Sequence, residues 1–223
     1  MAQIDFNERQ LTLKLVYYGP PRSGKTTNIQ AIHSKVDALN RGRLMTLDTK
    51  DDRTRFFDLL PIFFRSSALS FRVKVYTVPG QPMHAATRRV VLRQADGVVF
   101  VADSRRSEVR ANHDSYRNLA ENMERIGLLR HRVPVVIQYN KRDLDDIVPD
   151  DDIAPFDTGQ RVFTATAVQG EGVMDTFYGL LQQTWDAIDR HVGLARQFKL
   201  DQARFLKAVQ QHLEGAQEPG NKQ

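Results

Sequence analysis

The sequence predicts an α/β fold of three layers, a mainly parallel central sheet covered by helices on both faces. Short apolar runs typical of strands alternate along the chain with segments of helical period, and this alternation implies right-handed crossovers between parallel strands. The chain has 223 residues and is 41% apolar, enough to bury one ample core, so a single main domain is expected.

The expected elements follow one another in a regular order. The first strand is an apolar run, the second alternates between apolar and polar residues, and the fourth is an apolar, β-rich run that ends in a polar turn. The strands are expected near residues 11–18, 69–77, 97–102, 133–139 and 161–165, and the helices near 25–38, 83–94, 108–127 and 171–191. Residues 38–69 are less regular, with one short strand expected at 43–47.

A C-terminal extension follows the main domain, which we place at residues 1–192. Residues 193–214 are expected to form one amphipathic helix, because apolar residues recur there at intervals of three, four and seven. The stripe consists of Leu194, Phe198, Phe205, Leu206, Val209 and Leu213. Such a stripe packs on its own domain, binds a partner or lies on a membrane surface, and the first of these is favoured. Residues 215–223 are polar and are expected to form a disordered tail.

A complete phosphate-loop motif stands directly after the first expected strand. Residues 19–26 read G-P-P-R-S-G-K-T, which matches G-x-x-x-x-G-K-[ST]. A strand that leads into a glycine-rich turn and then a helix directs backbone N–H groups at one point, where they can hold a polyphosphate. Lys25 would reach the β- and γ-phosphates and Thr26 would hold Mg²⁺, whereas in an ordinary glycine turn the lysine would face water. The nucleotide-binding residues expected here are Gly19, Arg22, Ser23, Gly24, Lys25, Thr26 and Thr27.

A second motif bears on which base such a loop would accept. Asn140-Lys141-Arg142-Asp143 follows the strand expected at 133–139, and ligands sit at the carboxyl ends of strands in open α/β sheets. The Asp143 carboxylate can accept two hydrogen bonds from the N1–H and exocyclic amine of guanine, a donor pair that adenine lacks. Asn140 would tie this loop to the phosphate loop, and the Lys141 stem would cover one face of the purine. GTP or GDP is therefore the expected ligand, and a phosphate-loop ATPase or kinase is disfavoured.

These two motifs, with Thr77-Val78-Pro79-Gly80-Gln81 between them, resemble the Ras-like small GTPases over residues 10–190. A narrower resemblance is to the bacterial gliding-motility, or MglA-type, GTPases. It is carried by segments at residues 16–20, 24–28, 52–54, 56–58, 60–61, 76–81, 96–104 and 137–144. The resemblance implies a P-loop small-GTPase fold, and a GTP-hydrolysing switch in motility or cell polarity that requires Mg²⁺ and changes shape at residues 48–61 and 79–90.

The resemblance also assigns roles to residues in the two switches. In the first, Thr54 is expected to be the second Mg²⁺ ligand and Arg53 an arginine finger supplied in cis. Arg55 is a competing candidate for the finger, and a surface salt bridge is the plainer interpretation of Arg53. In the second, the Gly80 N–H would touch the γ-phosphate, and Gln81 would position the attacking water unless it is an ordinary loop amide.

The segment from Thr164 to Val168 aligns with the family loop whose backbone meets the guanine O6. Ala167 is the expected donor to that oxygen, and Thr166 is expected to brace Asp143.

Two departures from the Ras-like pattern bear on turnover. Thr77 stands where most Ras-like proteins have an aspartate that holds a Mg²⁺-bound water, a substitution that resembles the gliding-motility subgroup itself. Pro21 stands where glycine is usual, so its ring can crowd the catalytic groups, and it has no N–H to donate. Nucleotide binding should survive, because the N–H groups of residues 22–26 remain. The expected effect of Pro21 is on GTP hydrolysis, which it can impair. The alternative function is a GTP-binding scaffold with little or no hydrolysis.

The resemblance implies a roadblock-type (MglB-like) activating dimer and downstream polarity or motility effectors as partners. Composition disfavours other classes. The chain has no cysteine, which excludes disulfides, thiolate metal sites and prenylation, and no apolar run approaches the ~20 residues needed to cross a bilayer. The net charge of +5 is moderate and the arginines are scattered, so nucleic-acid binding has little support. The first residues do not form a signal peptide, and a cytoplasmic location is expected.

Overall fold

A computed structural model of the chain describes residues 2–48, 55–81, 84–129 and 132–213, and it confirms the α/β fold. Within these residues one sheet has the strand order β3-β4-β5-β2-β6-β7-β8, with β1 paired to β2 outside this path. The strands are β1 (Gln3–Asp5), β2 (Gln10–Tyr18), β3 (Met45–Asp48), β4 (Arg55–Arg65), β5 (Ser70–Thr77), β6 (Gly97–Asp103), β7 (Val135–Asn140) and β8 (Val162–Ala165). Strands β2, β5, β6, β7 and β8 are parallel to one another, whereas β1, β3 and β4 pair antiparallel.

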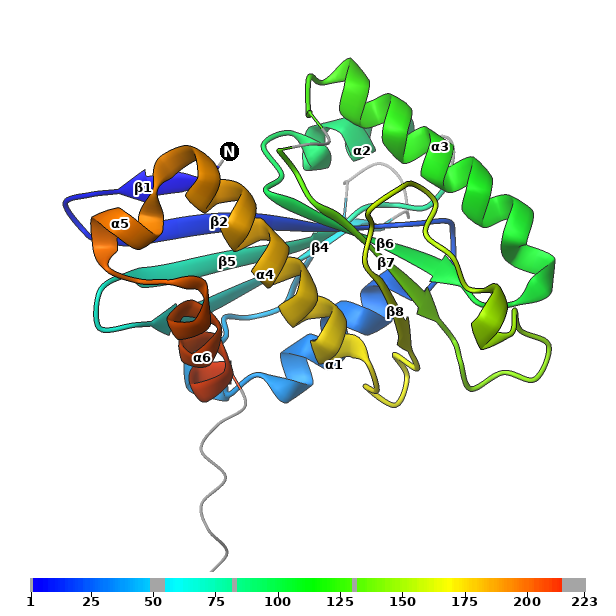
Figure 1. The fold of residues 1–223 in the computed structure, drawn as a ribbon. Helices are drawn as coiled ribbons and strands as arrows, with labels where there is room; N and C mark the ends of the chain where they lie inside the picture. The colour runs from blue at the N-terminus through cyan, green and yellow to red at the C-terminus, as the bar shows by residue number, and fades with distance from the viewer. Residues whose placement is uncertain (1, 49–54, 82–83, 130–131, 214–223) are drawn as a thin grey trace, which may run out of the picture.

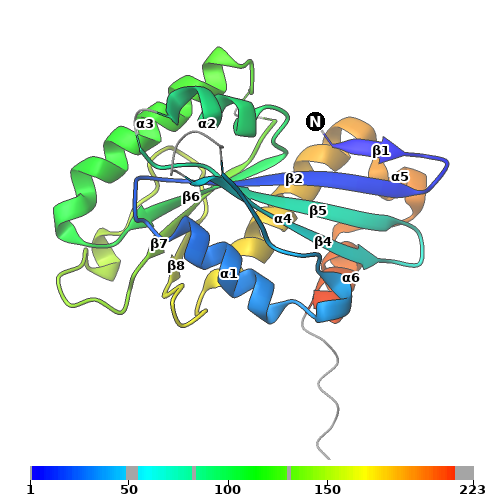
Figure 2. The same ribbon diagram turned by 180° about the vertical axis from the view of Figure 1, so that it is seen from behind.

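Helices cover both faces of this sheet, and the sheet separates the core into two apolar clusters. The helices are α1 (Lys25–Lys35), α2 (Ala85–Leu92), α3 (Val109–Arg125), α4 (Val173–Val192), α5 (Leu194–Phe198) and α6 (Gln202–Leu213). Figures 1 and 2 show α1, α4 and α6 on one face and α2 and α3 on the other. Strand β2 supplies both clusters, because Leu13 and Leu15 face α1 and α4 while Val16 and Tyr18 face α2 and α3.

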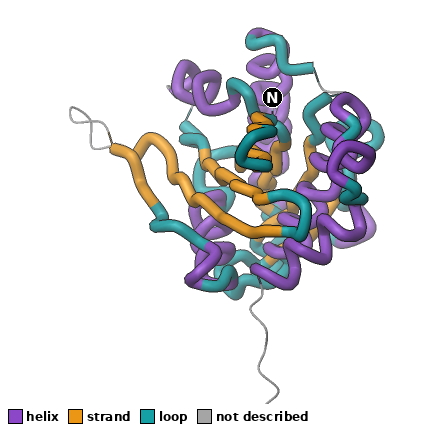
Figure 3. Tube along the Cα trace, turned by 90° about the vertical axis from the view of Figure 1, so that its left-hand side faces the viewer, coloured by secondary structure: helices purple, strands orange, loops and turns teal. Residues whose placement is uncertain are grey.

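The strands and helices predicted between residues 11 and 192 are present, with ends that differ by a few residues. Two strands, β1 and β4, were not predicted. Strand β4 lacks the alternation of apolar and polar residues that indicates a strand, because the side chains on its open face are also apolar. Phe63 on that face is 38% exposed. Figure 3 shows β3 and β4 at the edge of the sheet, curving away from the helical layers.

Pro61 also argued against a strand here, since proline is rare inside a sheet. The structure shows how the strand accommodates it. The Gly42 N–H donates to the Pro61 carbonyl oxygen at 2.8 Å, on the side away from β5. The nitrogen of a strand residue points to the same side as its carbonyl, so the N–H that Pro61 lacks is not needed by the ladder to β5.

The C-terminal extension consists of two helices, α5 and α6, where one was predicted. The break falls at Lys199, whose φ of +51° is left-handed and cannot continue a helix. Phe205 of α6 is fully buried. Its ring centroid lies 4.4 Å from that of Trp185 of α4 and 5.1 Å from that of Phe71 of β5. The apolar stripe therefore packs on the main domain. Among the described helices, none combines the length and apolar character that crossing a membrane requires.

Candidate functional site

The phosphate loop connects the end of β2 to the start of α1. Gly24 has a φ of +100°, and a Cβ there would lie 2.1 Å from the Asn140 side-chain nitrogen, so only glycine fits. The N–H groups of Lys25, Thr26 and Thr27 belong to the first turn of α1 and therefore have no intrahelical acceptor. These donors and the helix N-terminus form a cradle suited to an anion.

Lys25 is buried inside this loop. Its ammonium donates to the carbonyl oxygens of Gly19 at 3.0 Å and Pro20 at 2.6 Å. Burial, with a smaller contribution from the nearby Arg88 cation, lowers the pKa of Lys25 to about 7. A buried cation held by neutral carbonyls is a group that a phosphate would stabilise, so the loop fits the polyphosphate predicted for it.

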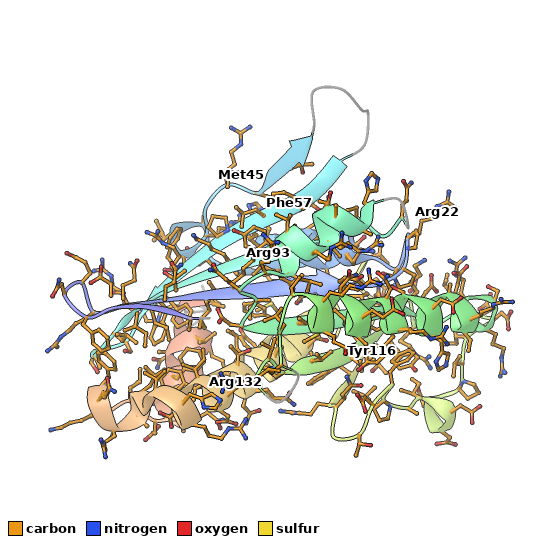
Figure 4. All side chains as sticks on the ribbon, turned by 90° about the horizontal axis from the view of Figure 1, so that it is seen from above. Arg22, Met45, Phe57, Arg93, Tyr116 and Arg132 are labelled. Atoms are coloured by element: carbon orange, nitrogen blue, oxygen red, sulfur yellow. The ribbon has the colours of Figure 1, made fainter. Side chains whose placement is uncertain are left out.

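Two further residues of the loop contribute in different ways. Arg22 has a left-handed φ of +62°, unusual for a residue other than glycine, and its exposed side chain lies on the outside of the loop (Figure 4). Ser23 is buried, and its hydroxyl has no hydrogen-bond partner in the structure. Such an orphaned hydroxyl next to an anion cradle is a candidate ligand contact.

A cavity of about 220 Å³ lies beside the phosphate loop, where β7 and β8 end. It is lined by Arg22, Gly24, Thr27, Asn140, Lys141, Asp143, Leu144, Ala167 and Val168. The buried Asn140 side chain joins the walls, because its Nδ2 donates to the Ser23 carbonyl at 2.8 Å and its Oδ1 accepts from the Ala167 N–H at 2.9 Å. The phosphate loop, the N-K-R-D turn and the 166–168 loop thus form one hydrogen-bonded unit.

The 166–168 loop differs in detail from what the sequence predicted. The Ala167 N–H, expected to meet the base, is already bound to Asn140. Thr166 donates its N–H to the Glu171 carbonyl at 3.1 Å, and no hydrogen bond between Thr166 and Asp143 occurs within the described residues. Val168 lines the cavity and is 73% exposed, so this residue is open to a ligand.

A buried carboxylate, Asp58 of β4, lies behind the phosphate loop. It is 4% exposed and accepts hydrogen bonds from three threonine hydroxyls. Thr26 and Thr77 reach it at 2.8 and 3.0 Å, and Thr46 does so at 2.9 Å. The Asp58 N–H in turn donates to the Thr77 hydroxyl at 2.8 Å. The sequence prediction missed Asp58, although an acid inside an apolar run, after two phenylalanines, was a signal.

The second switch lies against the phosphate loop. A Cβ at Gly80 would be only 2.5 Å from the Pro21 nitrogen, so the two backbones are in contact and a larger residue would not fit. Arg88 of α2 is buried, and its guanidinium donates to the carbonyl oxygens of Gln81 and, at 3.4 Å, of Pro79. The Gln81 side chain itself is exposed. Arg88 was also missed, because its contacts depend on the tertiary fold.

Two residues of the first switch, Arg53 and Thr54, lie outside the described residues, as does the side chain of Arg55. Their roles stay predictions.

A polar network beneath the cavity was not predicted. Gln138 of β7 is fully buried, and its Nε2 donates to Asn28 of α1 and Thr176 of α4, both at 2.9 Å. Asn28 donates in turn to the Gly24 carbonyl at 3.0 Å. The network therefore links the sheet and two helices to the phosphate loop. A glutamine inside an otherwise apolar strand was the signal that pointed to it.

Comparison with known proteins places the chain in a family. No protein-family model matches it. Over 179 residues, however, it is 41% identical to the mutual gliding-motility protein MglA of Myxococcus xanthus (strain DK1622), and the alignment covers 79% of this chain and 92% of that protein. The chain belongs to the MglA-type family of Ras-like small GTPases. Membership in the MglA-type family confirms the resemblance inferred from the motifs and associates the chain with motility-related GTPases.

Proposed function

We propose that this protein is a guanine-nucleotide switch that binds GTP and GDP with Mg²⁺ and hydrolyses GTP in bacterial motility or cell polarity. The observation that carries the proposal is the Asn140 side chain, which joins the phosphate loop to the loops of the base cavity. A phosphate cradle and a base cavity held in one unit suit a nucleoside polyphosphate. Asp143 lines that cavity and offers the acceptor pair that guanine requires.

The phosphates would be held by the backbone N–H groups of residues 22–27 and by the Lys25 ammonium. Mg²⁺ would be held by Thr26 and, when the γ-phosphate is present, by Thr54. The ion would offset negative charge on the phosphates. The Thr26 hydroxyl fits this ion, because Mg²⁺ is a hard cation that prefers oxygen ligands, and the hydrogen bond to Asp58 leaves the oxygen lone pairs of Thr26 available to the ion.

Asp58 supplies the charge that Thr77 lacks. In the Ras-like pattern a carboxylate belongs at position 77, whereas here the Thr77 hydroxyl donates to Asp58 at 3.0 Å. Asp58 also accepts from Thr26, the expected Mg²⁺ ligand, at 2.8 Å. We infer that Asp58 orients the Thr26 hydroxyl and provides negative charge near the ion, as outer-shell groups of metal sites do.

Hydrolysis would require Gln81 to orient the attacking water and Arg53 to stabilise charge on the phosphoryl oxygens. The contact between Gly80 and Pro21 supports the alternative, a scaffold with little hydrolysis, since it narrows the region that the γ-phosphate would enter. GTP turnover of the unmutated protein and of the Pro21→Gly variant, each with and without an activator, separates the two, because little activated turnover in the unmutated protein supports the scaffold and clear activated turnover supports the switch. A severalfold gain supports a switch limited by Pro21, and an unchanged rate removes the reason to doubt hydrolysis.

The family suggests two kinds of partner, a roadblock-type (MglB-like) activating dimer and downstream effectors of motility or polarity. Both would act from the cytoplasm. Residues 79–90 and the first switch are the surfaces that would change with the nucleotide, so these partners would read them.

The proposed function is tested by nucleotide competition with purified protein and Mg²⁺. GTP and GDP should displace a fluorescent GDP, and ATP should not. Asp143→Asn should weaken GDP binding by about 100-fold and favour xanthine nucleotides, because an amide suits the extra carbonyl of xanthine where the carboxylate suited the guanine amine. Equal competition by ATP would show that the base is not read.

A further inference from the structure

Asp103, the last residue of β6, is a buried carboxylate that does not line the base cavity. Its side chain is 1% exposed, and its Oδ2 accepts from Lys141 Nζ at 2.6 Å and from Arg105 Nη2 at 2.8 Å. Its Oδ1 accepts from the N–H and Nε of Arg105, both at 3.1 Å. Burial alone would raise the pKa of Asp103, but hydrogen bonds from Arg105 and Lys141 outweigh it and hold the pKa below its usual value.

The position of this carboxylate is fixed by the core. Asn112 of α3 is buried, and it pairs twice with the backbone of Asp103. The Asp103 N–H donates to the Asn112 Oδ1 at 3.0 Å, and the Asn112 Nδ2 donates to the Asp103 carbonyl at 2.8 Å. In the parallel ladder Asp103 lies opposite Asn140, the residue before Lys141. The carboxylate is therefore a fixed anchor one strand away from the N-K-R-D turn.

Lys141 reaches that anchor across the ends of two strands. Its φ of +69° places it in a left-handed turn directly after β7, and its ammonium lies at the end of β6. Because the strand order is β2-β6-β7, the Lys141 stem runs toward the side of the phosphate loop and lines the base cavity on the way. Its neighbour Arg142 donates instead to the Val148 carbonyl and to Asp150, both at 2.7 Å.

We propose that Asp103 is a positioning residue for nucleotide binding, which pins the Lys141 ammonium so that the lysine stem forms a fixed wall against one face of the base. The inference rests on the proposed function. Arg105 holds the same carboxylate through both of its oxygens. A lysine left free in solvent would lose its rotamer freedom when a base bound, and that loss amounts to about tenfold in affinity. The ion pair orders the stem before the nucleotide arrives.

A wall against the face of a purine does not distinguish the groups on its edge. Asp103 should therefore act equally on GDP and on IDP, which lacks the exocyclic amine. Asp143 should behave differently, because its carboxylate accepts from that amine in GDP alone. The ratio of GDP affinity to IDP affinity therefore separates two roles of Asp103. A positioning role through Lys141 leaves this ratio unchanged, whereas a general loosening of the loop changes it, because a loosened loop would also displace Asp143.

The test is the release rate of fluorescent GDP and IDP from the full-length protein, measured by chase with unlabelled nucleotide. Asp103→Asn should speed the release of both by about tenfold, with their ratio unchanged. Lys141→Met keeps the stem but loses the ion pair, and it should have a similar effect. The double variant should be no faster than the faster single variant. Asp150→Asn is the matched control, because it removes the carboxylate that pairs with Arg142, the neighbour of Lys141. The Asp150 side chain is 82% exposed, and its loss should leave the release rates unchanged.

Unchanged release in Asp103→Asn, additive effects in the double variant, or a change in the GDP-to-IDP ratio would each overturn the inference. If Asp103→Asn does not fold, Lys141→Met decides the question from the other end of the pair, and unchanged release there overturns it. Failure of the unmutated protein to bind fluorescent GDP is a separate outcome that overturns the proposed function as well.

Discussion

The base side and the switch side of the candidate site are held in different ways. On the base side, Asn140, Gln138 and Asp103 are buried, and each makes side-chain hydrogen bonds or ion pairs to other elements of the fold. On the switch side, Gly80 touches Pro21, and the loop is held by Arg88 through backbone carbonyl oxygens. The base side therefore depends on the identity of particular side chains, whereas the switch side depends largely on contacts made by the backbone.

This difference separates binding from turnover. Side chains that join elements of the core cannot be lost without leaving buried partners unsatisfied, which costs both stability and affinity. A loop held through its backbone tolerates a change of its exposed side chains, so variants there should alter rates more than binding. Four predictions test this separation.

Asn140→Ala should have the largest effect on binding. It leaves the Ser23 carbonyl and the Ala167 N–H without their partner, and it detaches the phosphate loop from the base cavity. GDP affinity should fall on the order of 100-fold, and unfolding free energy by about 2–4 kcal/mol. Fluorescent-nucleotide titration and urea unfolding measure the two. The exposed Asn7→Ala is the control, and an affinity loss no larger than in that control would contradict a joined site.

Gln81→Ala should show the opposite pattern. Its side chain is exposed and its backbone is what Arg88 holds, so the loop should keep its place without the amide. Activator-stimulated GTP hydrolysis should fall by about 30- to 100-fold, while GDP and GTP affinity should change by less than about twofold. Single-turnover hydrolysis beside nucleotide titration gives both numbers. Gln30→Ala, an exposed glutamine on α1, is the control. Full activity in the Gln81→Ala protein would remove its water-positioning role.

The same two regions show how far the sequence could lead. The motif-bearing loops were predictable, because the phosphate loop and the N-K-R-D turn follow apolar strands and their residue types specify donors and acceptors. Strand β4 was not, since Pro61 and the apolar residues of its open face mask the alternation. Arg88 was not, because its partners are backbone carbonyls brought to it only by the fold. The division of the C-terminal extension at Lys199 was missed, although Asp201, whose carboxylate accepts from the Arg204 N–H at 2.8 Å, was a signal for the start of a second helix.

Asp58→Asn sharpens the comparison, because this residue lies between the phosphate loop and the switch side. It joins Thr26 of the phosphate loop to Thr77, which precedes the second switch. An amide keeps the shape but removes the charge. The concentration of Mg²⁺ that half-maximally slows GDP release should rise by about tenfold, as for other outer-shell changes at metal sites. A titration of free Mg²⁺ measures it, with Thr46→Val as a control that removes one donor and keeps the carboxylate. An unchanged Mg²⁺ dependence would show that Asp58 serves the fold alone.

A separate expected effect is a dependence of stability on pH that originates at Lys25. Burial lowers the pKa of Lys25 to about 7, far below its value in the unfolded chain. Below pH 7 both states carry the proton, and the folded protein bears the full cost of a buried charge. Between pH 7 and 10 the unfolded chain binds more protons than the folded one, so stability should rise with pH, by up to about 1 kcal/mol per unit. Urea unfolding of the nucleotide-free protein at several pH values measures this slope.

Lys25→Met isolates that contribution, because other groups, such as Lys14 with its own lowered pKa, titrate equally in both proteins. The difference in stability between the two should shrink as pH rises from 7 to 10. Bound GDP should abolish the slope, since phosphate stabilises the ammonium and raises its pKa. Parallel curves for Lys25→Met and the unmutated protein would mean that the loop carbonyls already satisfy the ammonium. The buried ammonium of the phosphate loop would then need no anion to stabilise it.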